Sequence, residues 1–139
     1  MQHSSSRKRI WIGALVIVLM GAAAYIAAAS SSNARHETVV NAERLTHGTA
    51  AEGPDKIRKY GCYSCHTIPG VDGANGLVGP PLKDIVDRTY IAGRLPNTPA
   101  NIALWIQHPH SVDPHTVMPE MGVTEQDSRD IAAYLYTQR

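Results

Sequence analysis

The feature that most constrains this chain is a cysteine pair followed at once by a histidine, Cys62-x-x-Cys65-His66, in the stretch KYGCYSCHTIPG. These are the only 2 cysteines among 139 residues. A disulfide between them would close a very short loop, which constrains the unfolded chain least and therefore stabilises least. A thioredoxin-type dithiol would need a preceding strand. The preceding GPDKIRKYGC instead predicts a short helix, with Pro54 near its start and Gly61 past its end.

Two metal-centred interpretations of the motif remain. Zinc needs four tetrahedral ligands, but Cys62, Cys65 and His66 are bunched closely, and no second C-x-x-C or H-x-x-x-H pair completes the set. A c-type haem fits better, because the thiols attach to its vinyl groups and the adjacent imidazole becomes the proximal ligand of the iron. We therefore predict one covalent haem c, attached through Cys62 and Cys65.

The N-terminal third contains a second strong pattern. Residues 10–29 carry no charge and no proline, and about 20 such residues in a helix match a bilayer core of roughly 30 Å. Basic residues at 7–9 precede this stretch, so the positive-inside rule predicts a cytoplasmic segment 1–9 and a transmembrane anchor at 10–29. A cleaved signal peptide ending near Ala29 is the alternative, although signal peptides have a shorter apolar core of about 7–15 residues.

The rest of the chain divides by composition. Residues 30–51 lack apolar periodicity and predict a mobile linker with at most one weak helical turn. Residues 52–139 form the predicted compact domain, with ten acidic and eight basic side chains and hence a formal charge of −2. This balance does not favour nucleic acid as a partner. A domain of this size without phenylalanine needs a staple, which a covalent haem would supply.

Three blocks in this region resemble the class I c-type cytochromes, in particular monohaem, membrane-anchored bacterial members: GCYSCH at 61–66, GPPL at 79–82 and MPEMGVTEQDSRDIAAYL at 118–135. The resemblance covers residues 52–139. It implies an all-α cytochrome c fold of three to five helices around one covalent haem, with the first and last helices crossing. In this chain a single N-terminal transmembrane helix would precede that fold.

Local signals place two further helices. TPANIALWIQ predicts a helix that starts at Thr98, before Pro99, and carries Ile102, Trp105 and Ile106 on one side. TEQD predicts another that starts at an N-cap, Thr124, with Asp127 three residues later. Its apolar stripe would pack on the first helix of the domain, through these residues: Gly53, Ile57, Ile131, Ala132, Tyr134 and Leu135.

The resemblance also implies a ligand environment. The Pro80 carbonyl would accept a hydrogen bond from the proximal His66 and fix its orientation, although GPP alone could be only a rigid turn. Leu82 would pack against the haem face, and Trp105 would pack there as core rather than donate to a propionate. Met118 would be the sixth ligand.

The choice of Met118 has competitors. Pro119 favours an extended backbone at Met118, suited to a loop that lays a thioether across a haem. The family spacing of methionine to glycine before the last helix matches Met118 to Gly122. Met121 would more plausibly pack. The remaining candidates are histidines on a separate loop, His108, His110 and His115.

These residues predict one-electron transfer rather than enzymatic turnover, because histidine and methionine together saturate the iron. The protein would be a free shuttle or a cytochrome subunit of an oxidoreductase complex. The resemblance implies a bacterial inner membrane location with the domain in the periplasm, a quinol-oxidising complex as donor, a haem-copper oxidase as acceptor, and no small-molecule substrate. The alternatives are a haem peroxidase or gas sensor with a labile methionine, and a protein in which the haem is only structural.

Overall fold

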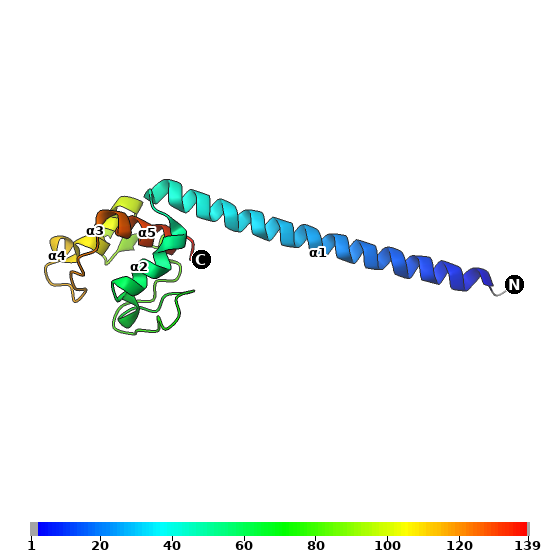
Figure 1. Cartoon of the computed structure of the whole chain (residues 1–139), viewed down its shortest axis with the longest axis horizontal. Helices are drawn as coiled ribbons and strands as arrows, with labels where there is room; N and C mark the ends of the chain where they lie inside the picture. Colours follow the sequence, from blue (N-terminus) through cyan, green and yellow to red (C-terminus); the bar gives the residue numbers. More distant parts are fainter. Residues whose placement is uncertain (1–2, 139) are drawn as a thin grey trace. The chain divides into compact units, whose positions relative to one another are not determined.

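The structure, a computed structural model, describes residues 3–138. The first two residues of the predicted basic segment and Arg139 lie outside this range. Contacts divide the chain into two units, one ending at Glu37 and the other beginning at Thr38. The fold is mostly helical, as predicted (Figure 1). Its elements in chain order are α1 (His3–Thr46), η1 (Ala50–Glu52), α2 (Gly53–Lys59), η2 (Cys62–Ser64), η3 (Ile85–Asp87), β1 (Tyr90–Ile91), β2 (Leu95–Pro96), α3 (Pro99–Gln107), α4 (Pro109–Val112) and α5 (Glu125–Tyr136).

Helix α1 carries the apolar stretch of the N-terminal third. From Trp11 onward it is long and apolar enough to cross a membrane, with a mean hydropathy of 2.3 over its most apolar window. Large side chains on it are exposed, for example Trp11 at 72% and Tyr25 at 76%. Such a surface favours a lipid environment, and an anchor and a signal sequence both meet this description.

The predicted linker over residues 30–51 is wrong for residues 30–46, which continue helix α1. The serine hydroxyls at 30–32 donate to backbone carbonyls three or four residues earlier, at 2.8–2.9 Å. They therefore do not draw the backbone out of the helix. Near its end the helix buries Ala42 and Thr46 within the second unit. Two small buried side chains leave no apolar periodicity in the sequence, and the compact unit consequently begins earlier than residue 52.

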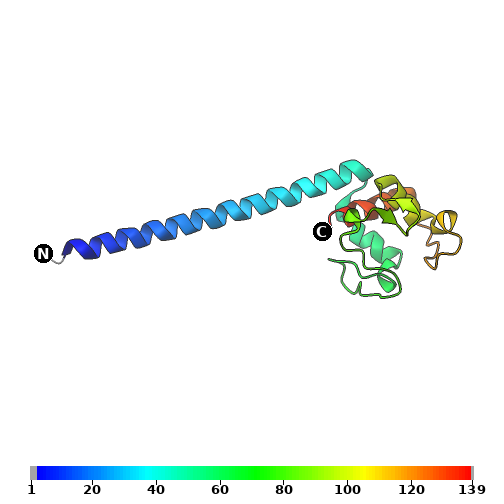
Figure 2. The ribbon, with the colours of Figure 1, turned by 180° about the vertical axis from the view of Figure 1, so that it is seen from behind.

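Helices α2 and α5 pack against each other, and a glycine permits their close approach (Figures 1 and 2). A Cβ on Gly53 would overlap the Cβ of Tyr134 and lie 3.0 Å from the Asp130 carbonyl oxygen. Helix α5 begins at the predicted N-cap, where the Thr124 hydroxyl accepts a hydrogen bond from the Asp127 N–H. The predicted contact between the first and last helices of the domain is therefore present.

The segment between these helices contains α3, α4 and a small hairpin. Helix α3 starts as predicted, with the Thr98 hydroxyl accepting from the Asn101 N–H. The hairpin was not predicted. Strands β1 and β2 pair antiparallel, with Tyr90 opposite Pro96, and two residues each are too few to show the alternation that identifies a strand.

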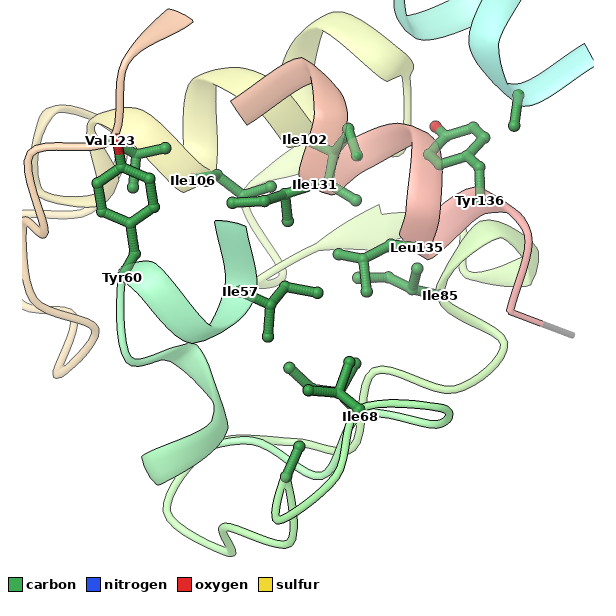
Figure 3. Close-up of a cluster of buried hydrophobic side chains, with 14 of the residues drawn as sticks. Ile57, Tyr60, Ile68, Ile85, Ile102, Ile106, Val123, Ile131, Leu135 and Tyr136 are labelled. Carbon is green, nitrogen blue, oxygen red and sulfur yellow. The ribbon is translucent and has the colours of Figure 1, made fainter. Parts of the chain in front are cut away.

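Aliphatic side chains from α2, α3 and α5 form the centre of the core. Figure 3 shows Ile57 of α2, Ile102 and Ile106 of α3, and Ile131 and Leu135 of α5 facing one another. All five are at most 7% exposed. The predicted apolar stripes are thus on the buried faces of their helices, and the hydrophobic effect holds the three helices together.

A buried carboxylate ties α5 to the end of α2. Asp127 is 7% exposed and accepts from Tyr60 Oη at 2.6 Å and from Lys59 Nζ at 2.7 Å, while Lys56 Nζ lies 3.2 Å away. The Lys59 ammonium, the Tyr60 hydroxyl and the Lys56 ammonium lower the pKa of Asp127. The charged carboxylate is therefore the form that the folded state favours.

Asp127→Asn should lower the free energy of unfolding by about 1–3 kcal/mol, because it weakens hydrogen bonds to a charged group. The native carboxylate has a lowered pKa, so its stabilisation is present above the unfolded value of about 4 and is lost as the pH falls below it. Guanidinium unfolding at several pH values should show a shallower acid decline for this variant. Asp72→Asn, at an exposed carboxylate, is the control and should leave both quantities unchanged; a steep acid decline retained in Asp127→Asn would contradict the assignment.

Candidate functional site

The second unit contains a cavity of about 320 Å³ inside its core. Its walls are largely aliphatic and include core residues of α2, α3 and α5: Ile57, Ile102, Ile106, Ile131 and Leu135. The seven residues predicted for the site all line this one cavity: Cys62, Cys65, His66, Pro80, Leu82, Trp105 and Met118. Segments far apart in the sequence therefore meet around a space that excludes most water.

The two cysteines lie on the tight turn after α2. Gly61 adopts a left-handed conformation (φ 70°) that ends the helix, and η2 follows immediately. Both thiols are free and partly buried. Burial raises the pKa of the Cys62 thiol, so it is held as a neutral group at the cavity wall.

The His66 ring is held between two parts of the GPPL loop. Its Nδ1 lies 2.8 Å from the Pro80 carbonyl oxygen. The Gly79 N–H donates to the Cys65 carbonyl at 2.8 Å, and a Cβ on Gly79 would lie 2.6 Å from Nδ1 and 2.8 Å from Nε2 of the imidazole. Only glycine lets the loop come this close. With Nδ1 donating to Pro80, the lone pair of Nε2 is available for a ligand.

Met118 and Met121 both line the cavity, and they differ in their surroundings. Met118 is partly buried, and its N–H donates to the Thr116 hydroxyl at 3.2 Å. Met121 is 44% exposed, and its methyl group lies 4.0 Å from where a Cβ on Gly61 would be. Met121 therefore packs toward the cysteine turn.

The competing histidines lie away from this set. None of His108, His110 and His115 is among the residues that line the cavity. His108 and His110 instead lie beside Glu120, with Nδ1–Oε distances of 3.6 and 3.9 Å.

Trp105 and Leu82 are partly buried and pack on the edge of the hydrophobic cluster. Sequence reasoning missed the lining residues between GPPL and α3, which come from η3, β1 and the turn after β1. Among them, Arg88 is the only charged side chain that lines the cavity, and it donates to the Pro81 and Lys83 carbonyls. Nothing in the sequence distinguished Arg88 from the other basic residues.

The donors around the cavity fit a covalently held haem. Thiols on one turn, an oriented imidazole beside them, a thioether from a distant loop and aliphatic walls are the groups that such a porphyrin requires. The zinc alternative fits less well, because residues 3–138 contain no cluster of three or more His, Cys, Asp or Glu side chains arranged to hold a metal ion.

Comparison with known proteins agrees with this description. The model of one protein family, described as cytochrome c, matches residues 50–139. Neither the curated proteins nor the solved structures that were searched contain a match to the chain.

Proposed function

This chain belongs to the cytochrome c family, and we propose that it carries single electrons through one haem c bound by Cys62 and Cys65, with His66 and Met118 as axial ligands. The family membership supports haem-based electron transfer. The observation that carries the residue assignment is that all four side chains line one apolar cavity.

In this proposal each residue around the cavity has a defined task. The Pro80 carbonyl accepts the Nδ1 proton of His66, at 2.8 Å, which fixes the tautomer and directs Nε2 at the iron. The Cys62 and Cys65 sulfurs form thioethers that keep the cofactor attached. Leu82 and Trp105 pack against it. The haem supplies the Fe(III)/Fe(II) couple.

The same residues determine the reduction potential. The Met118 sulfur is a soft ligand that favours the reduced iron, and aliphatic walls disfavour the extra charge of the oxidised form. We therefore expect a moderately high positive potential. Because Met118 also fills the sixth position, the iron has no open site for oxygen, peroxide or a substrate.

Carbon monoxide separates this function from a peroxidase or gas sensor. The reduced wild-type protein should bind the gas slowly, since Met118 must leave first. Fast binding would instead favour an open or easily vacated iron. The absorbance of the reduced protein after mixing with carbon monoxide measures this directly.

For the location, we propose that residues 10–29 of α1 anchor the protein in the bacterial inner membrane, with residues 1–9 in the cytoplasm and the cytochrome domain in the periplasm. The apolar length of α1 supports an anchor. The basic residues at 7–9 support the orientation.

An anchored protein should remain in the membrane pellet during an alkaline carbonate wash, because 20 apolar residues resist extraction. The measurement is the haem absorbance of pellet and supernatant. A mature N-terminus near Ser30 and a soluble product would contradict the anchor and indicate a cleaved signal peptide.

The partners in this proposal are a quinol-oxidising complex as donor and a haem-copper oxidase as acceptor. This rests on family analogy, with the protein acting either as a shuttle or as a fixed subunit. Ten acidic and eight basic side chains over residues 52–139 give a charge of −2, which argues against strong lysine-based steering. Proteins that co-purify from detergent would identify the partners.

A further inference from the structure

The loop that carries Met118 has few polar anchors. Beyond the Met118 N–H, which donates to Thr116, the polar contacts of residues 119–123 with the rest of the described chain are confined to one side chain, Glu120. No helix or strand includes these residues. The position of the Met118 sulfur therefore depends on apolar packing and on what holds Glu120.

Glu120 lies between two imidazoles. Its Oε2 is 3.6 Å from His108 Nδ1, and its Oε1 is 3.9 Å from His110 Nδ1. Each imidazole thus faces a different oxygen of the same carboxylate. Both distances allow ion pairing and exceed those of ordinary hydrogen bonds.

The two imidazoles project from a fixed base. Pro109, between them, is fully buried. The His108 N–H donates to the Leu104 carbonyl at 2.8 Å, and the Ser111 hydroxyl donates to the His108 carbonyl at 2.7 Å. The end of α3 and the start of α4 are therefore anchored, while the Glu120 loop is the partner that can move.

We propose that Glu120 is a positioning residue for Met118, held by His108 and His110 when these carry charge. The proposal rests on the His66 and Met118 ligation proposed above. Glu120 follows Met118 by two residues, so anchoring its carboxylate to α4 limits how far the thioether can swing from the cavity. None of the three side chains lines the cavity itself.

The arrangement should make the loop sensitive to pH. An imidazole changes charge between about pH 5 and 8, so both ion pairs exist at the acid end of this range and are lost toward the alkaline end. Nearby, the His115 N–H and then the Arg94 guanidinium lower the pKa of Asp113, so this carboxylate stays ionised throughout. The pairs are half-exposed, and an exposed ion pair changes an equilibrium by up to about fivefold.

The rate at which carbon monoxide displaces Met118 from the reduced protein tests this, because the gas carries no charge at any pH. From about pH 5.5 to about pH 8 the wild-type rate should rise, by up to about fivefold for each ion pair lost. Glu120→Gln, and the double variant His108→Gln/His110→Gln, should bind fast at both ends of the range. Glu125→Gln, at an exposed carboxylate that pairs with Arg129, is the matched control and should keep the wild-type profile.

A pH step that persists in Glu120→Gln, or a wild-type rate that does not change with pH, would overturn the proposal while leaving Met118 as the ligand. Absence of the near-infrared sulfur-to-iron band from the oxidised wild-type protein would instead overturn the ligation, and this inference with it. The spectrum of the oxidised protein therefore separates the two failures.

Discussion

Gly79→Ala should reduce the yield of haem-loaded protein by about tenfold, since overpacking a fitted site costs about 1–3 kcal/mol. The added Cβ would lie 2.6 Å from His66 Nδ1 and 2.8 Å from Nε2. The loop cannot easily retreat, because the Gly79 N–H donates to Cys65 at 2.8 Å and Pro80 accepts from the imidazole. The ring must therefore turn away from the cavity. The ratio of haem absorbance to protein in the purified product measures the effect.

A suitable control is Gly73→Asn. No atom lies within 4 Å of a Cβ built on Gly73, and asparagine tolerates the positive φ of 77° found there. This variant should load haem as the wild type does. Equal loading of Gly79→Ala and the control would show that the close approach to His66 has no role in assembly.

Met118→Ala should abolish the near-infrared sulfur-to-iron band of the oxidised protein and lower its reduction potential, because the thioether that favours the reduced iron is lost. Axial ligands set haem potentials over roughly 0.8 V, and the change should be a sizeable part of that range. The reduced variant should also bind carbon monoxide rapidly. Spectra of the oxidised protein and a redox titration measure these effects.

Met121→Ala is the matched comparison, since it removes the other methionine that lines the cavity. Met121 is 44% exposed and packs toward Gly61, so its loss should leave the band in place and change the potential little. Loss of the band in Met121→Ala and its retention in Met118→Ala would exchange the two assignments.

Local sequence signals predicted the helices of the cytochrome domain well, because each start is specified by a few adjacent side chains. The Thr98 and Thr124 hydroxyls accept hydrogen bonds at the starts of α3 and α5, and Gly61 ends the turn after α2. These caps act over three or four residues and can be read without knowing the fold.

Features that depend on distant partners could not be predicted in the same way. Residues 30–46 were expected to be irregular, yet they are helical, since their small buried side chains, Ala42 and Thr46, meet the second unit without an apolar pattern. Asp127 was expected only near an N-cap, whereas its side chain contacts Lys59 and Tyr60. Such contacts join segments more than 60 residues apart, as do those across the cavity.

The central claim, a haem held covalently by Cys62 and Cys65, is tested most directly by acid-acetone extraction of the denatured protein after expression with the cytochrome c maturation machinery. We predict that the haem stays with the polypeptide in the wild type. In Cys62→Ala and Cys65→Ala, one thioether should remain or maturation should fail. Haem that leaves the wild-type polypeptide for the organic phase would contradict the account.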